Sequence, residues 1–157
     1  MNVDQLMTKE VFSCLPGDSL AKAARLMWDH DIGCLPVVDA QGRVLAMITD
    51  RDICMAGHLT GKRLAELSIG SAMSKKVVAC NPTDSAETAE ELMRLSQIRR
   101  LAVVDTGGSM VGIISLNDLA RASARVRGHK PKTVELQDVA ATLAAICEPR
   151  VAHQAAA

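Results

Sequence analysis

The chain has 157 residues, of which 48% are hydrophobic, and its 18 basic and 18 acidic side chains leave a formal net charge of zero. No net field therefore draws it to nucleic acid or to an anionic membrane surface, and its two aromatic residues, Phe12 and Trp28, are too few for a base-stacking platform. This length fits one ordinary domain or two small repeats that share a core.

The amino terminus, MNVDQLMTKE, has neither a basic start nor an apolar signal core, and no apolar run approaches the length of a membrane span. We therefore expect a cytoplasmic protein with no membrane partner. The five cysteines are scattered, odd in number and without CxxC spacing, which is typical of small apolar residues in a reducing compartment. They are Cys14, Cys34, Cys54, Cys80 and Cys147.

An internal repeat organises the chain. Residues 6–53 align with residues 72–119 without a gap when the sequence is shifted so that Met7 meets Met73. Identical pairs under this shift include Cys14/Cys80, Pro16/Pro82, Asp39/Asp105 and Asp52/Asp118. The alignment indicates a duplication, and we place the two copies at residues 3–60 and 69–126.

Each copy shows the same predicted elements in chain order. Short strands are expected at residues 11–15 and 77–80, where a proline stops each of them. A serine then offers a helix cap, and apolar side chains at helical spacing predict helices that run to about His30 and Ser96.

Two almost continuously apolar strands come next in each copy, joined by AQG or TGG, which predicts a hairpin with a glycine at positive φ. A second helix should begin after Thr49 or Ser115. The unit is therefore β-α-β-β-α, and the fold class is α/β (α+β). Because such a small unit is not stable alone, we expect the two copies to pack as a pseudo-twofold pair.

The sequence after the second copy predicts a basic exposed segment and then a helical extension over residues 133–148, capped by Thr133 and ended by Pro149. The basic residues are Arg121, Arg125, Arg127, Lys130 and Lys132. A nucleic-acid contact is one reading of this segment, but the zero net charge favours an exposed connector.

One motif recurs at the end of each copy, as Thr49-x-x-Asp52 and Ser115-x-x-Asp118. A threonine or serine three residues before an acid is a common helix cap, and duplication copies caps as well. A helix amino terminus also favours phosphate, and an aspartate one turn later can accept both hydroxyls of a ribose. Cap and ligand site both remain open on the motif alone.

The paired units resemble tandem CBS domains (cystathionine-β-synthase-type domains), which form a Bateman module. The resemblance covers about residues 3–121 and rests on MT or MS before the first strand, LPVVD or LAVVD in the middle, and hydrophobic-Thr/Ser-x-x-Asp at the end. The chain looks most like small stand-alone bacterial CBS-pair proteins. This resemblance implies a non-enzymatic regulatory module with two clefts, which bind adenosyl ligands such as AMP, ADP, ATP, NAD or S-adenosylmethionine. It also implies a homodimer, a disc of four CBS units, that signals to an unidentified protein partner.

The resemblance assigns roles to individual residues. Phosphate contacts fall on Thr49, Ser115, Arg99 and Arg100, and ribose contacts fall on Asp52 and Asp118. Adenine contacts fall on Val11, Val77, Leu35 and Val37, although plain core packing is the favoured reading for any single one of these four. Likewise, the two arginines can be solvated charges at a helix end. Copy two has Ala102 where copy one has Pro36, which distinguishes the shapes of the two clefts.

Other chemistry finds little support. The sequence has no GxSxG elbow, P-loop or HExxH motif, so we predict no enzyme activity and no catalytic residue. The side chains of the consecutive residues Asp29, His30 and Asp31 point in different directions at a helix end, so we predict no metal site. The alternative to ligand binding is a structural or redox-responsive interaction protein that uses its cysteines.

Overall fold

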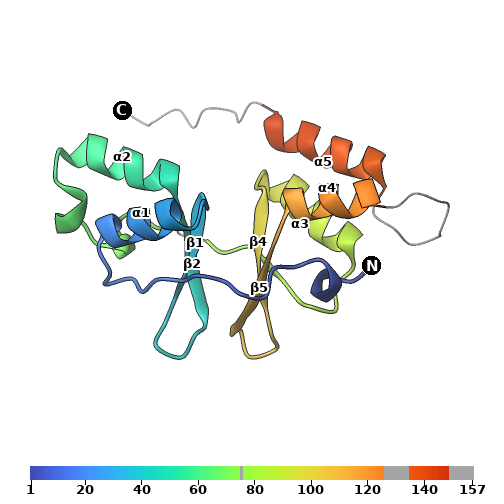
Figure 1. The fold of residues 1–157 in the computed structure, drawn as a ribbon, viewed down its shortest axis with the longest axis horizontal. Helices are drawn as coiled ribbons and strands as arrows, with labels where there is room; N and C mark the ends of the chain where they lie inside the picture. The colour runs from blue at the N-terminus through green and yellow to red at the C-terminus, as the bar shows by residue number, and fades with distance from the viewer. Residues whose placement is uncertain (75, 126–134, 149–157) are drawn as a thin grey trace.

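The computed structural model describes residues 1–74, 76–125 and 135–148. Figure 1 shows two small sheets that face each other at the centre of the molecule, with their hairpin turns at one end and the helices at the other. Helices α1 and α2 flank one sheet, and helices α3, α4 and α5 flank the other. The predicted α+β fold of two repeats with an additional C-terminal helix is confirmed.

The elements follow the repeat. Copy one contains α1 (Leu20–Asp29), β1 (Cys34–Val38), β2 (Val44–Thr49) and α2 (Asp50–Thr60). Copy two contains β3 (Ala79–Cys80), α3 (Ala86–Ser96), β4 (Arg100–Val104), β5 (Met110–Ser115) and α4 (Leu116–Arg125). Short 3-10 turns η1 (Val3–Gln5), η2 (Leu64–Glu66) and η3 (Ile69–Ser71) precede or join the copies, and α5 (Leu136–Cys147) follows them. The strand orders are β1-β2 and β3-β4-β5.

The predicted caps and turns are present. Ser19 Oγ accepts a hydrogen bond from the Lys22 amide at 3.2 Å, and Ser85 Oγ accepts the equivalent bond from the Thr88 amide at 3.2 Å. Both hairpins turn at a glycine with φ of 80°, a conformation that L residues rarely adopt. The two hairpin tips also pair with each other, because Val44 N donates to Gly108 O at 3.2 Å.

The first strand of each copy is shorter than predicted. In copy two it is reduced to β3, which pairs in parallel with β4, and in copy one it is a single bridge between Cys14 and Val37. Cys14 N donates to Pro36 O at 3.0 Å and Val38 N donates to Cys14 O at 2.9 Å. Pro36 has no N–H, so the next bond of this parallel ladder cannot form. Ala102 at the equivalent place keeps its donor.

The two copies exchange the segments that precede them. Val3 belongs to the core of copy two and Ile69 to the core of copy one, and both side chains are fully buried. Thr8 pairs with Ile113 of β5 through two backbone hydrogen bonds of 2.9 Å, and Ser74 N donates to Met47 O of β2 at the equivalent place. Each half is therefore completed by residues that lie before the other half in the chain.

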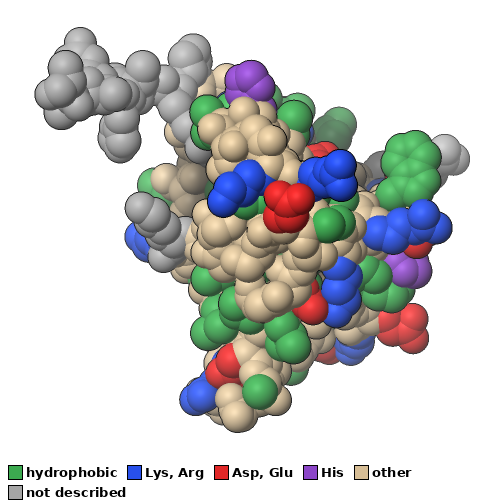
Figure 2. Space-filling model, turned by 90° about the vertical axis from the view of Figure 1, so that its left-hand side faces the viewer, with side chains coloured by type: hydrophobic (Ala, Val, Ile, Leu, Met, Phe, Trp, Pro, Cys, Tyr) green, Lys and Arg blue, Asp and Glu red, His purple; other side chains and the backbone are tan. Residues whose placement is uncertain are grey.

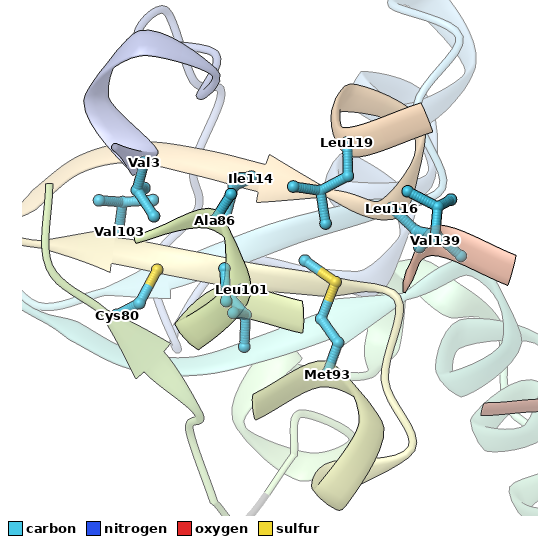
Figure 3. Close-up of a cluster of buried hydrophobic side chains, with 11 residues drawn as sticks. Val3, Cys80, Ala86, Met93, Leu101, Val103, Ile114, Leu116, Leu119 and Val139 are labelled. Atoms are coloured by element: carbon cyan, nitrogen blue, oxygen red, sulfur yellow. The ribbon is translucent and has the colours of Figure 1, made fainter. Parts of the chain in front are cut away.

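Two hydrophobic clusters form the core, one in each copy. Figure 3 shows the cluster of copy two, in which side chains from β3, β4, β5, α3 and α4 meet Val3 from the N-terminal turn and Val139 from α5. Burial of each large apolar side chain contributes about 1.5–3 kcal/mol, so these two contacts attach the N-terminal turn and α5 to copy two.

Helix α5 covers the helix pair of copy two. Val139 and Thr142 are buried against it, and Gln97 Nε2 donates to Ala145 O at 3.4 Å and to Glu148 O at 3.3 Å. The predicted cap at Thr133 and most of the predicted basic segment lie outside the described residues. No helix within the described ranges has both the length and the apolar composition needed to span a bilayer.

Candidate functional site

The Thr/Ser-x-x-Asp motif lies where the last strand of each copy runs directly into a helix. In copy one, Thr49 is extended (φ −116°, ψ 163°) and caps α2. The Thr49 amide and Thr49 Oγ1 both donate to Asp52 Oδ2, at 2.9 and 2.7 Å, and the Asp52 amide donates back to Thr49 Oγ1 at 3.2 Å. The motif is a reciprocal capping box, so the structural reading of the motif is correct.

The capping box uses only one carboxylate oxygen of Asp52. Within the part of the chain that the structure describes, Oδ1 of this half-buried aspartate accepts no hydrogen bond. This oxygen is available to a polar ligand, whereas the amides of the first turn of α2 already donate to Gly33 O, Asp50 Oδ1 and Thr49 Oγ1. Capping and ligand binding are therefore compatible in copy one.

Copy two repeats the box but occupies the second oxygen. The Ser115 amide and Ser115 Oγ donate to Asp118 Oδ2 at 2.8 and 2.5 Å, and the Asp118 amide lies 3.4 Å from Ser115 Oγ. Arg121 Nη2 donates to Asp118 Oδ1, and the Asp118 side chain is only 7% exposed. The residue equivalent to Arg121 in copy one is Met55, which carries no donor.

Arg100 crosses from copy two toward copy one. It begins β4, opposite Ser115 in β5, and is half-buried, whereas Arg99 is exposed. A Cβ atom placed on Gly33 would lie 3.3 Å from Asp50 Oδ2 and 3.8 Å from Arg100 Nη2. The Arg100 guanidinium therefore lies beside the first residue of α2, next to Thr49, and adds a positive charge at that helix start.

The four predicted adenine contacts differ in accessibility. Leu35 and Val37 are fully buried in the core of copy one, so they present no surface to a ligand in this structure. Val11 and Val77 are half-buried. The assignments of all four residues stay predictions, and only the two half-buried valines offer exposed surface.

Val11 lines a small cavity of about 190 Å³ between the copies, with Lys9 and Ser13 from its own segment. Val38 and Gly42 of copy one and Met110, Val111 and Gly112 of copy two complete the lining. Val38 pairs with Val44 at the hairpin end of β2, while Thr49 ends the same strand, five residues and about 16 Å away. The structure does not bring Val11 and the capping box into one cavity.

Lys9 is a cation of this cavity that the sequence predictions omitted. The repeat contained the signal, because Lys9 aligns with Lys75 two residues before Val11 and Val77. Lys9 Nζ forms an exposed ion pair with Asp4 at 2.9 Å. Lys75 lies outside the described residues.

The cysteines are free thiols, and three of them are buried. Burial raises the pKa of Cys14 to about 11 and that of Cys80 to about 12, and it also raises the pKa of Cys34. Because the thiolate is the reactive form, these three side chains are poor redox sensors at neutral pH. No cluster of three or more metal-ligating side chains occurs among residues 1–74, 76–125 and 135–148.

Comparisons with known proteins agree with this architecture. The family model described as CBS domain matches residues 3–58 and 68–125. The chain is 40% identical over 119 residues to CBS domain-containing protein YhcV of Bacillus subtilis (strain 168), which covers 76% of this chain and 83% of that one. It is 30% identical over 132 residues to Hypoxic response protein 1 of Mycobacterium tuberculosis (strain CDC 1551 / Oshkosh), covering 84% of each chain.

Among solved structures, the chain resembles the CBS domain pair of protein MJ0100 in complex with 5′-methylthioadenosine and S-adenosyl-L-methionine. The TM-score is 0.70 at 26% identity, covering 77% of this chain and 94% of that chain.

Proposed function

The chain belongs to the CBS-domain family, and from that premise we propose that this CBS-pair regulatory module binds an adenosyl ligand at the start of α2. The candidate ligands are AMP, ADP, ATP, NAD and S-adenosylmethionine. The observation that carries the proposal is the capping box of copy one, in which Asp52 Oδ1 is left without a partner among the described residues. The adenosyl complex of the MJ0100 domain pair supports the ligand class.

We assign the polar contacts of the ligand by chemistry. The Asp52 carboxylate accepts hydrogen bonds from the ribose hydroxyls, since its free oxygen is an acceptor only. The Arg100 guanidinium and the positive end of the α2 helix dipole favour a phosphate or another anionic group beside Thr49. Val77 is the accessible candidate for adenine, because Val11 lines a cavity that is separate from the capping box.

In copy two, the same chemistry requires Arg121 to leave Asp118 before a ribose can bind. Ser115 and Arg99 remain the candidate phosphate contacts there. Copy one is therefore the stronger of the two proposed sites.

We propose that the protein acts without catalysis. Ligand binding would shift the relative populations of two arrangements of the copies, which a second subunit and an unidentified protein partner then detect. The exchanged segments at Val3 and Ile69 provide a physical link, because each attaches one copy to the chain of the other.

The test is thermal unfolding of the purified protein with each candidate ligand and with GTP for comparison. A ligand at about a hundredfold excess over its Kd adds roughly 2.7 kcal/mol to the free energy of unfolding, so the midpoint should rise by several degrees. We expect Asp52→Ala to abolish this rise. Failure of every adenosyl ligand to raise the midpoint would overturn the proposal.

Asp52→Ala also removes a cap, which costs about 1 kcal/mol by itself. Asp18→Ala is the matched control, because Asp18 Oδ2 accepts the Leu15 amide at 2.9 Å at the start of α1 and is not part of the proposed site. The control variant should lose stability yet keep the ligand-dependent rise.

A further inference from the structure

A groove lies between α1 and α2 on the outer side of copy one. It encloses about 470 Å³ and is lined mainly by apolar side chains. Its lining residues are Ala24, Met27, Trp28, Asp31, Ile32, Gly33, Asp50, Ile53, Cys54 and Leu64. Figure 2 shows this end of the molecule, where basic and acidic side chains are interspersed with hydrophobic ones. Helix α5 lies on the other half of the molecule (Figure 1), so it leaves this groove open.

The equivalent surface of copy two is covered by α5. Under the repeat, Met27 and Ile53 of the groove correspond to Met93 and Leu119, and the last two are fully buried. Both belong to the hydrophobic cluster that includes Val139 of α5. The same helix pair is therefore open in copy one and covered in copy two.

One position of this surface carries an acid in copy two alone. Ala24, which lines the open groove, corresponds to Glu90 on α3. Glu90 is 6% exposed, and its Oε1 has no hydrogen-bond partner among the residues that the structure describes. An ionised carboxylate without a partner is costly to bury. The charged form of Glu90 therefore works against the packing of α5.

The charges around Glu90 increase this cost. Burial first, then Asp138 on α5 and Glu87 on α3, raise the pKa of Glu90 to about 7, and Arg94 partly offsets them. Two bases of the helix pair are already paired with other acids, Arg94 with Glu91 on α3 and Arg121 with Asp118 on α4. Ionisation of Glu90 would therefore place like charges on the two sides of the contact between α3 and α5.

Few contacts hold α5 in place. Val139 and Thr142 are its buried side chains, and Gln97 Nε2 donates to Ala145 O at 3.4 Å and to Glu148 O at 3.3 Å. The helix lies outside both sheets, so it can leave without breaking a strand pair. Elements with few buried side chains open locally at a lower free energy than the core.

We propose that α5 is a pH-dependent cover of copy two, which packs on α3 and α4 while Glu90 is protonated and detaches when Glu90 releases its proton to the solvent. In the detached state the carboxylate is hydrated, so it needs no partner in the protein. Detachment uncovers the surface around Met93 and Leu119 and gives copy two the open helix face that copy one already has.

The sign follows from the two protonation states. The covered state holds the Glu90 proton more tightly than the detached state, because burial raises the pKa of Glu90 from 4.5 to about 7. The packing of α5 is therefore strongest in acid and weakens as the pH rises through this interval.

Amide hydrogen exchange of the full chain, measured from about pH 5 to about pH 8 and divided by the intrinsic exchange rate, tests the proposal. We expect the opening equilibrium of the α5 amides to rise at least about tenfold over this range. At every pH it should exceed that of the β4 amides, because α5 opens while the sheet stays closed. Asp138→Asn removes the facing charge and should reduce the pH dependence without abolishing it.

Glu90→Gln keeps the size of the side chain without its charge, so α5 exchange in this variant should not depend on pH. Glu90→Ala, which introduces the residue of copy one, should give the same result. Glu135→Gln is the matched control, since Glu135 is exposed at the start of α5 and its side chain forms no capping hydrogen bond. This control should keep the pH dependence. Exchange of α5 only together with β4, or a pH dependence that is absent from the wild type or persists in Glu90→Gln, overturns the proposal.

Discussion

Copy one and copy two share the same backbone plan but differ in what covers their helices. Both hairpins turn at a glycine with φ of 80°. In both copies a serine caps the first helix and a capping box begins the second helix. Only the helix pair of copy two is covered by α5. The duplicated half that kept its helix groove open also kept a carboxylate oxygen without a partner among the described residues, at Asp52.

This comparison separates two roles within one fold. Copy two packs against the N-terminal turn through Val3 and against α5 through Val139, and Arg121 donates to Asp118. Copy one presents an open groove and an Asp52 carboxylate oxygen that has no partner among the described residues. On the basis of this asymmetry we assign the proposed ligand response to copy one and the role of a rigid partner to copy two.

Core truncations at equivalent positions should show the largest difference between the copies. Leu119 is fully buried under α5, whereas Ile53 is 3% exposed and lines the open groove. Truncation of such side chains costs about 2–5 kcal/mol, depending on how well the site relaxes. We expect Leu119→Ala to lie near the upper end of this range and Ile53→Ala near the lower end.

Urea unfolding of both variants measures this difference. Equal losses of unfolding free energy would show that α5 adds nothing to the packing of copy two.

Glu90, which is buried between α3 and α5, should give the next largest effect: a pH dependence of the unfolding free energy. It is 6% exposed, and its Oε1 has no hydrogen-bond partner among the residues that the structure describes. Burial first, then the charges of Asp138 on α5 and of Glu87, raise the pKa of Glu90 from 4.5 to about 7, which Arg94 partly offsets. A carboxyl with a raised pKa in the folded state destabilises the fold when it ionises.

The sign follows from proton linkage. The folded state holds the Glu90 proton more tightly than the unfolded state, so stability is greatest below pH 4.5 and falls as pH rises toward 7, by about 1–3 kcal/mol. Glu90→Gln should flatten this part of the stability profile and stabilise the protein above pH 7. The measurement is unfolding free energy from pH 4.5 to 8. An unchanged profile in Glu90→Gln would exclude Glu90 as the titrating group.

Local features of the fold were predictable from the sequence because their causes are local. The glycine turns, the serine caps and the Thr49 capping box all depend on residues within about four positions of one another. The short first strand of copy one has a local cause as well, because Pro36 lacks an N–H donor. Its effect could not be predicted without knowing which edge of β1 faces Cys14.

Long-range features were not predictable. Nothing in the spacing of Val3 or Ile69 indicates that each belongs to the core of the other copy. The site predictions had the same limit: Arg100 was placed with phosphate, but its reach to Gly33 of copy one depends on the packing of the two sheets. The burial of Glu90 depends on α5, which has no counterpart in copy one.

The smallest expected change in stability tests whether Arg121 alone separates the two capping boxes. Arg121→Met places in copy two the residue that copy one has at this position, Met55. The Arg121 side chain is 65% exposed, so loss of its ion pair with Asp118 should cost less than about 1 kcal/mol. If the ion pair blocks the second site, calorimetric titration with an adenosyl ligand should change from one bound ligand per chain to two. An unchanged stoichiometry would mean that the copies differ for another reason. The next candidate is the pair of positions before the central strand, where copy one has Gly33-Cys34 and copy two has Arg99-Arg100.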